Sequence, residues 1–351
     1  MRMPHGTVRS EAARAVACPD KFRGTLSASE AASAMARGLR RAGFDDVREL
    51  PLADGGEGTL DVLVAVRGGS RRQTRVTGPL GDPVDATWAM LADGTAIIEM
   101  AQASGLALVG DRNDALRATT RGTGELMAAA ARAGAKRLLV CVGGSATTDG
   151  GLGAVDALGW ALPVDTTVAC DVSTAFLDAA RVYGPQKHAT DAQIALLTRR
   201  LERLAEHYLA RTGVEVDAIE GSGAAGGLAG GLAAIGARVE PGFDVVAAAV
   251  DLEDALDGAT LVVTGEGRLD RTSLEGKVVG GVLDWAADLG VEHCAVIAGQ
   301  VTDDAREELS VHHTQVLALT DRVWQASEAF TRAALLVEEA AVEAARQALG
   351  V

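Results

Sequence analysis

The chain has 351 residues, of which 48% are hydrophobic and 23% charged, and its formal net charge is −15. This composition is typical of a globular protein, and the length is enough for about two domains. The negative charge argues against nucleic acid or an anionic membrane surface as a partner, because Lys and Arg supply the affinity for both. A few basic side chains in one cleft could still bind an anionic small molecule.

The N-terminus and the cysteines predict a cytoplasmic protein. The first residues, MRMPHGTVRSEAARA, lack the apolar core of a signal peptide and are expected to form a frayed leader. No apolar run reaches the length of about 18 residues that a membrane span needs. The four cysteines lie far apart without a C-x-x-C pair, which favours free thiols in a reducing compartment over disulfides or a zinc site.

The chain opens with two units of strand, loop and helix. Strands are predicted at 15–18 and 47–52. The first helix begins after Ser27, because Glu30 completes a capping box with it, and the second follows the loop Asp-Gly-Gly-Glu-Gly at 54–58. Repeated units of this kind favour a parallel sheet with helices on its faces.

The middle of the chain has a different pattern. Strands are expected at 73–77, 84–90 and 95–100, separated by turns rich in Gly, Pro and Asp. A strand at 137–142 then leads through a glycine-rich loop to a helix, and a long amphipathic helix is expected at 191–212. The three early strands indicate a hairpin-like insertion rather than another strand–helix repeat.

The last third returns to alternating elements, with a strand at 259–264 and a helix at 277–289 among them. We therefore predict an α/β fold of two α/β domains. Residues 1–76 and 255–351 form a discontinuous parallel-sheet domain of the Rossmann or flavodoxin-like kind, and residues 77–254 form a mixed α/β domain inserted in it. The active site is expected in the cleft between the two domains.

The strongest local motif is the loop Gly-Gly-Ser-Ala-Thr-Thr-Asp-Gly-Gly at 143–151, between a buried strand and a helix. Glycines let backbone N–H groups converge on an anion, hydroxyls add donors, and the following helix N-terminus favours negative charge. A tight turn without a ligand is the alternative, but the composition favours a phosphate cradle. It is not a Walker A loop, because the sequence contains no G-x-x-x-x-G-K-[ST].

Acidic residues follow several predicted strands, at the edge where open α/β folds bind ligands. Phosphoryl transfer needs oxygen ligands for Mg²⁺, a carboxylate that accepts the hydroxyl proton, and cations against the phosphates. Each acid alone could be a turn former or a helix cap, and a paired-carboxylate hydrolase is a weaker alternative because aromatic residues are few. The acids are Asp20, Asp54, Glu57, Glu99, Asp171, Glu266 and Asp270, and the candidate cations are Lys21, Arg23, Lys187, Arg268 and Lys277.

The segment Gly221–Gly226 matches G-x-G-x-x-G, so dinucleotide binding has to be considered. Against it, Val214–Asp217 alternates like a half-exposed strand, whereas the first strand of a dinucleotide-binding fold is buried on both faces. Close helix packing through Gly and Ala is the favoured explanation. An NAD(P)-dependent oxidoreductase that uses this segment stays open as an alternative function, as does a non-catalytic protein that binds a hydroxy acid.

Together these motifs resemble the bacterial type of the glycerate kinase family, in the same order and nearly from end to end. The resemblance implies ATP-dependent phosphorylation of D-glycerate to a phosphoglycerate with Mg²⁺, in a cleft between two α/β domains. It is carried by the segments ACPDKFRGTLSASEAA (17–32), LPLADGGEGT (50–59), VTGPLGDPV (76–84), IIEMAQASGL (97–106), TTRGTGEL (119–126), VGGSATTDGGLG (142–153), ACDV (169–172), VYGPQK (182–187), GSGAAGGLAGGL (221–232) and TGEGRLDRTSLEGK (264–277).

The chemistry of these residues suggests a role for each. The phosphates of ATP are expected on Gly143, Gly144, Ser145, Ala146, Thr147 and Lys187, and Mg²⁺ on Asp171 and Asp270. Asp54 or Glu266 would accept the hydroxyl proton, and Asp270 completes the catalytic set. The substrate-binding set is Asp20, Arg23, Ser104 and Arg268, of which one arginine pairs with the substrate carboxylate because the planar guanidinium suits it.

Three features depart from the family pattern. Residues 19–24 read Pro-Asp-Lys-Phe-Arg-Gly instead of P-D-S-F-K-G, the segment 159–168 is short, and 173–178 lacks an N-P-L-containing loop. These changes bear on the substrate and the turnover rate more than on the fold. The sequence leaves open which hydroxyl is phosphorylated and whether the chain forms a homodimer.

Overall fold

The chain folds into two α/β units, and this computed structural model describes residues 13–311 and 314–351. Unit one comprises Met1–Leu52 and Asp251–Val351, and unit two comprises Ala53–Val250. The leader predicted at the N-terminus falls almost wholly on residues 1–12, which lie outside the described residues. None of the described helices has both the length and the apolar character required to cross a membrane.

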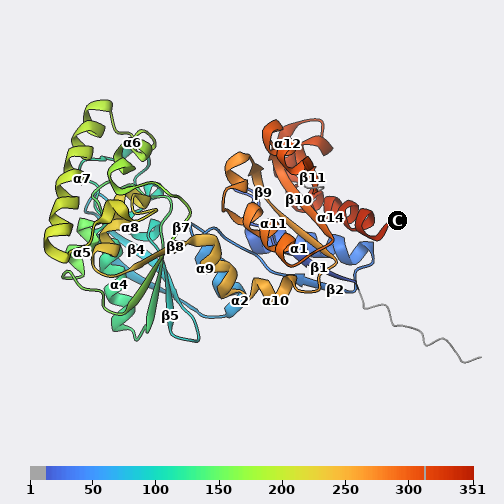
Figure 1. Cartoon of the computed structure of the whole chain (residues 1–351), viewed down its shortest axis with the longest axis horizontal. Coiled ribbons are helices and arrows are strands. Elements are labelled where there is room, and N and C mark those ends of the chain that lie inside the picture. Colours follow the sequence, from blue (N-terminus) through green and yellow to red (C-terminus); the bar gives the residue numbers. More distant parts are fainter. Residues whose placement is uncertain (1–12, 312–313) are drawn as a thin grey trace, which may run out of the picture. The chain divides into compact units, whose positions relative to one another are not determined.

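Unit one is built on a parallel sheet with the strand order β11-β10-β9-β1-β2. Figure 1 shows strands from the beginning of the chain (blue) beside strands from its end (orange to red) in this sheet. The unit is therefore discontinuous in sequence, as predicted. Its strands are β1 (Arg14–Ala17), β2 (Asp46–Glu49), β9 (Leu261–Leu269), β10 (His293–Val301) and β11 (Gln315–Ala318).

The helices of unit one form where local signals predict them. The Ser27 hydroxyl accepts from the Glu30 N–H, and the Glu30 carboxylate accepts from the Ser27 N–H, which is the expected capping box. Gly38 lets the first helix approach the last one closely, because a side chain there would collide with the Glu338 carbonyl. The helices are α1 (Ala28–Ala42), α10 (Leu252–Leu256), α11 (Val278–Asp288), α12 (Asp303–Val311), α13 (Ala326–Thr331) and α14 (Ala333–Leu349), with 3-10 turns η6 (Arg271–Leu274) and η7 (Leu319–Arg322).

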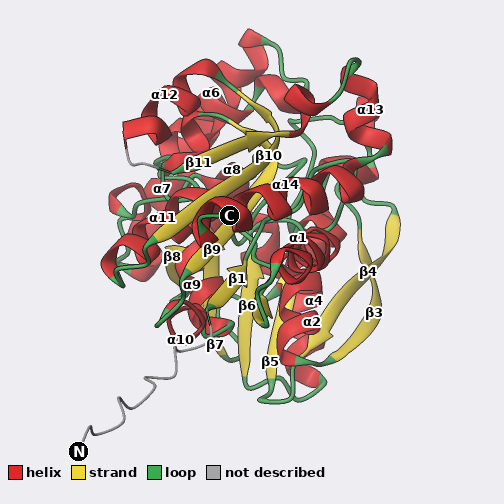
Figure 2. Cartoon of the chain, turned by 90° about the vertical axis from the view of Figure 1, so that its right-hand side faces the viewer, coloured by secondary structure: helices red, strands yellow, loops and turns green. Residues whose placement is uncertain are grey.

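Unit two contains a mixed sheet with the order β3-β4-β5-β6-β7-β8. The strands from β5 to β8 are parallel, whereas β3 and β4 form the antiparallel ribbon visible in Figure 2. The predicted hairpin and the predicted mixed character of this unit are confirmed. The strands are β3 (Ser70–Thr77), β4 (Pro83–Met90), β5 (Thr95–Glu99), β6 (Arg137–Cys141), β7 (Asp165–Cys170) and β8 (Arg238–Pro241).

The helices of unit two cover this sheet around a core that includes Trp88, Ile98, Met127 and Leu228. They are α2 (Thr59–Arg67), α3 (Ala101–Ser104), α4 (Arg121–Arg132), α5 (Leu152–Ala157), α6 (Ala179–Tyr183), α7 (Asp191–Thr212), α8 (Ala224–Ala234) and α9 (Gly242–Ala249). Short 3-10 turns are η1 (Leu106–Leu108), η2 (Gly110–Arg112), η3 (Phe176–Asp178), η4 (Pro185–Lys187) and η5 (Val216–Ala218).

The unit boundaries differ from the sequence-based ones near residues 76 and 255. Residues 53–76 belong to unit two, because β3 pairs with β4 along its whole length and the start of α2 is hydrogen-bonded to Glu99 of β5. The second boundary falls after Val250. The alternating segment Val214–Asp217 is not a strand, since it runs into the 3-10 turn η5, and β8 was not foreseen.

Candidate active site

In unit two, two glycine-containing loops meet at the carboxyl edge of the parallel strands. We call residues 54–58 the acidic loop and residues 143–151 the glycine loop. A β-carbon at Gly55 would lie 2.5 Å from the Gly242 Cα and 3.0 Å from the Ala169 Cβ, and one at Gly143 would lie 3.2 Å from the Gly56 Cα. The acidic loop, with Asp54 and Glu57, is therefore packed against the ends of β6, β7 and β8, where open α/β sheets bind ligands.

Glu99 at the end of β5 holds the acidic loop in place. Its side-chain oxygen Oε1 accepts from the Gly58 N–H at 2.8 Å and from the Leu60 N–H at 2.9 Å, at the N-terminus of α2. Glu99 is only 5% exposed, and burial raises its pKa although the two N–H donors lower it. Of the acids singled out from the sequence, Glu99 therefore has the structural role of a helix cap.

The glycine loop is anchored along its backbone. The Gly144 carbonyl accepts from the Leu106 N–H at 2.8 Å, and the Ala146 N–H donates to the Ser104 carbonyl at 3.0 Å. Ser104 itself is fully buried, and its hydroxyl is paired with the Thr123 hydroxyl at 2.8 Å. The predicted substrate residue Ser104 thus contributes its backbone to the loop, while its side chain is engaged with α4.

Several N–H groups of the glycine loop have no acceptor among the described residues. Within the described part of the chain, no group accepts a hydrogen bond from the backbone N–H of Gly143, Gly144, Ser145, Thr147 or Thr148. The Thr148 hydroxyl is also buried without a partner in the described residues. Ser145, Thr147 and Thr148 are buried, and buried donors are almost always satisfied by protein, water or ligand, so this cluster of donors is suited to an anion.

Asp149 fixes the far end of the glycine loop. Its carboxylate accepts from the Thr120 N–H at 2.8 Å, the Thr120 hydroxyl at 2.9 Å, the Gly151 N–H at 3.2 Å and the Gly153 N–H at 3.3 Å. Burial raises the pKa of Asp149, and these donors partly offset the shift. The sequence showed Asp149 only as one letter of the loop, and its role as an anchor could not be read from the pattern.

Lys187 lies against the same loop from η4. Its side chain is buried, and Nζ donates to the Thr147 carbonyl at 2.6 Å and lies 5.6 Å from the centre of the Tyr183 ring. Burial lowers the pKa of Lys187 to about 7, while the charge of Asp149 acts in the opposite direction. Asn113, which the sequence did not single out, donates to both the Ala146 carbonyl at 3.1 Å and the Lys187 carbonyl at 2.9 Å.

In unit one, the predicted residues gather at the carboxyl edge of β1 and β9. The Asp20 N–H donates to the Gly265 carbonyl at 2.8 Å. A β-carbon at Gly267 would lie 2.8 Å from the backbone nitrogen of Arg23. The loop after β1 is thus packed on the end of β9, which carries Glu266. Arg23 and Arg268 are exposed, and neither forms an ion pair with another residue that the structure describes.

Glu266 is the most perturbed carboxyl of this edge. Its pKa is raised to about 7, chiefly by burial and also by the charges of Asp20 and Asp270, while Ser273 and Lys277 act in the opposite direction. Its Oε1 is buried and has no hydrogen-bond partner among the described residues. A carboxyl with a pKa near neutrality and an unpaired oxygen is suited to accept a proton from a substrate.

Asp270 begins the turn that follows β9. Its Oδ1 accepts from the Thr272 N–H at 3.0 Å and from the Thr272 hydroxyl at 2.7 Å, and these bonds lower its pKa. Ser273, in turn, accepts from the Asp270 N–H at 3.1 Å. Asp270 is therefore ionised and held in a defined place.

For magnesium, the donor chemistry is suitable. Within residues 13–311 and 314–351, no three His, Cys, Asp or Glu side chains form a ready metal cage. Mg²⁺ usually takes one or two carboxylates together with substrate phosphates and water, so a full cage is not needed. The charges of Asp20 and Asp270 both raise the pKa of Glu266, against the opposite effect of Lys277, and a divalent cation would offset the charge of these carboxylates.

The predicted residues thus fall into two sets, one in each unit. Unit one carries Asp20, Arg23, Glu266, Arg268 and Asp270, and unit two carries Asp54, Ser104, Gly143, Gly144, Ser145, Ala146, Thr147, Asp171 and Lys187. Asp171 directly follows β7, at the same edge as the glycine loop.

The segment Gly221–Gly226 serves close packing. Gly226 has a φ of 70°, and a side chain there would collide with the Thr147 carbonyl of the glycine loop. Ala225, Gly226 and Gly227 are left-handed, so the start of α8 is kinked, and a 3-10 turn rather than a strand precedes it. The arrangement differs from the strand–turn–helix that dinucleotide binding requires.

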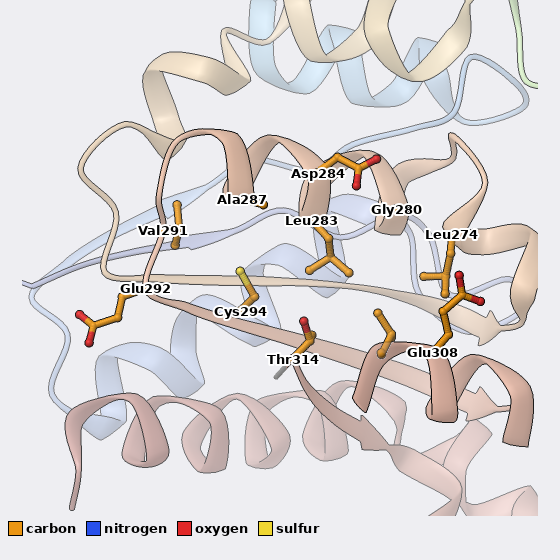
Figure 3. A pocket seen from close by; sticks show the side chains of 11 residues that line it. Leu274, Gly280, Leu283, Asp284, Ala287, Val291, Glu292, Cys294, Glu308 and Thr314 are labelled. Carbon is orange, nitrogen blue, oxygen red and sulfur yellow. The ribbon is translucent and has the colours of Figure 1, made fainter. Parts of the chain in front are cut away.

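A cavity of about 280 Å³ lies elsewhere in unit one, between α11, α12 and β10, as Figure 3 shows. Asp284, Glu292 and Glu308 line it together with the thiol-bearing Cys294. None of the predicted site residues lines this cavity, and its carboxylates would repel an anionic substrate. It is therefore separate from the candidate site.

Comparisons with known proteins show the family of the chain. The model of the glycerate kinase family matches residues 15–166 and 161–349, and the two matches meet inside the short segment 159–168. The chain is 41% identical over 330 residues to a glycerate 2-kinase of Escherichia coli, which covers 82% of this chain and 86% of that protein. It is 39% identical over 365 residues to a glycerate kinase of Bacillus subtilis, covering 93% of this chain and 95% of that one.

A solved structure is similar over nearly the whole chain. The crystal structure of a putative glycerate kinase 2 from Salmonella typhimurium superimposes with a TM-score of 0.80 and 33% sequence identity. The match covers 97% of this chain and 99% of the other. The predicted fold class is confirmed by the observed sheets and by this neighbour.

Proposed function

This chain belongs to the glycerate kinase family, and we propose that it transfers the γ-phosphoryl group of ATP to a hydroxyl of D-glycerate, giving ADP and a phosphoglycerate. The observation that carries the proposal is the row of N–H donors in the glycine loop for which the described part of the chain offers no acceptor, at the carboxyl edge of parallel strands. Kinases and NTPases of other folds also bind the phosphates of the nucleotide with backbone N–H donors.

Phosphate binding is assigned to unit two. The N–H groups of Gly143, Gly144, Ser145 and Thr147 would donate to phosphate oxygens, and Gly144 itself is exposed to solvent. Asp171 and Asp270 are the proposed ligands of Mg²⁺, which when bound neutralises charge on the transferred phosphoryl group.

Proton acceptance is assigned to unit one. In the proposed step the Oε1 of Glu266 takes the proton of the attacking hydroxyl, because it is unpaired and its pKa lies near neutrality. Arg23 or Arg268 would pair with the substrate carboxylate, since both are exposed and form no ion pair in the described residues. Asp54, in the acidic loop, is the alternative base.

The 2-hydroxyl is the proposed acceptor, which gives 2-phosphoglycerate. The name of the Escherichia coli relative, a glycerate 2-kinase at 41% identity, supports this choice. A cytoplasmic location is proposed as well, from the free thiols and the family.

The test is ADP release by the purified protein with ATP, Mg²⁺ and D-glycerate, with L-lactate, tartronate and no acid as controls. Phosphorus NMR of the product then distinguishes 2-phosphoglycerate from 3-phosphoglycerate. We expect ADP release that depends on D-glycerate and a single 2-phospho product. Exclusive 3-phosphoglycerate would refute the proposed regiochemistry, and turnover with none of the acids would refute the activity.

A further inference from the structure

Lys187 has an unusual environment for a lysine, because it is 1% exposed and forms no ion pair with another described residue. Its ammonium group donates to a backbone carbonyl, that of Thr147 at 2.6 Å, and faces the Tyr183 ring. A lysine is rarely buried without a paired carboxylate, since removing its charge from water is costly. The glycine loop, which Lys187 contacts, offers a reason for the burial of this lysine.

The contacts of Lys187 determine how the loop presents its backbone. Lys187 Nζ binds the Thr147 carbonyl, and Asn113 Nδ2 binds the Ala146 carbonyl. In a planar trans peptide the N–H points opposite to the C=O. With both carbonyls turned toward Lys187 and Asn113, the N–H groups of Thr147 and Thr148 point the other way, and these are among the loop donors without a described acceptor.

We propose that Lys187 is a positioning residue of the glycine loop, and that its amine takes up a proton when a nucleotide binds there. The proposal rests on the proposed function, because it takes the bound anion to be a nucleotide phosphate. An anion on the loop favours the charged form of a nearby amine. Both the neutral and the charged amine of Lys187 can donate a hydrogen bond to the Thr147 carbonyl. The glycine loop therefore keeps this contact before and after the nucleotide binds, while the charge of the amine changes on binding.

The other groups near Lys187 are compatible with this linkage. The charge of Asp149 in the glycine loop favours the charged form of the Lys187 amine. The Asp149 carboxylate itself accepts four hydrogen bonds from Thr120, Gly151 and Gly153, so it is held in place by these donors and forms no ion pair with Lys187. Tyr183 contributes its ring, and the neighbouring His188 is exposed. Since the pKa of Lys187 is lowered to about 7, the amine is mostly neutral at pH 8 before binding.

The experiment is calorimetric titration of MgADP at pH 8, where the nucleotide is fully ionised, in two buffers with different ionisation enthalpies. A rise of one pKa unit on binding corresponds to uptake of about 0.4 proton per site. We expect this uptake in the wild-type chain and in Lys136→Met, a control at an exposed lysine, and its loss in Lys187→Met. Lys187→Arg, which stays charged, should bind without uptake.

The outcomes separate the two proposals. MgADP binding without proton uptake by the wild-type chain overturns the role of Lys187 and leaves the kinase function standing. The same uptake in Lys187→Met as in the wild type also overturns it. If the wild-type chain does not bind MgADP, the proposed function fails, and the inference fails with it. The absence of uptake in the wild-type titration would overturn the proposal without relying on the folding of any variant.

Discussion

Replacing Glu266 by Gln should make the protein more stable and nearly inactive at the same time. The wild-type carboxyl has its pKa raised from 4.5 to about 7, first by burial and then by Asp20 and Asp270. Each pKa unit corresponds to about 1.4 kcal/mol, so the charged form lowers the free energy of unfolding by at most about 3 kcal/mol. The amide keeps the shape and removes this cost.

The sign of the pH dependence follows from the raised pKa. Below pH 4.5 the carboxyl is neutral in both the folded and the unfolded state, so the wild type and Glu266→Gln should be about equally stable. As the pH rises to about 7, the wild type should lose stability relative to the variant, and the difference should stay constant above that. Urea unfolding between pH 4 and 8.5 measures it, with the exposed Glu253→Gln as a matched control.

Activity should change in the opposite direction. Only the ionised carboxyl can accept the hydroxyl proton, so kcat/KM of the wild type, whose pH dependence reports the pKa of the free enzyme, should fall about tenfold per pH unit below pH 7. Loss of a general base typically lowers the rate by about 10²- to 10⁴-fold, and Glu266→Gln should also lose the acidic limb of the profile. Near-normal kcat in this variant, or an acidic limb below pH 5 in the wild type, would refute the reasoning.

Gly226→Ala should destabilise unit two by more than about 2 kcal/mol, because the new side chain meets the Thr147 carbonyl at a left-handed φ; an unchanged melting temperature would contradict this. Glu99→Ala should free the acidic loop and lower kcat about tenfold or more with binding of MgADP retained, whereas equal loss of nucleotide binding would point to general misfolding. Asp54→Asn should lower kcat by orders of magnitude with the folded state intact, as judged by circular dichroism; a rate within twofold of the wild type would remove Asp54 from the site.

Much of the fold could be predicted from the sequence because its signals are local. The capping box at Ser27 fixed the start of α1, and the turns rich in Gly, Pro and Asp marked the β3–β4 ribbon. The C-terminal region forms two helices, α13 and α14, because Arg332 between them has a φ of −112°, which is not helical. The first unit boundary was placed too late because β3 belongs to a sheet whose other strands lie further along the chain.

The sequence was sufficient to predict which loops form the candidate site, but not the role of each side chain in them. Motif order placed the glycine loop and the acidic loop on strand ends, where the structure has them. Whether a polar side chain faces a ligand or the interior depends on tertiary packing. Ser104 is paired with Thr123, and Asn113 supports the loop although no sequence pattern marks it.

Glu99 and Glu266 illustrate what distinguishes a structural carboxylate from a chemical one. Both lie at or near the end of a parallel strand, and burial raises the pKa of both. The Oε1 of Glu99 accepts from two backbone N–H groups, so its lone pairs are committed to the acidic loop. The Oε1 of Glu266 is buried without a partner in the described residues, so its lone pairs are available to a proton from a substrate. A raised pKa alone therefore identifies neither role, and the hydrogen-bond partners of the carboxylate oxygen decide between them.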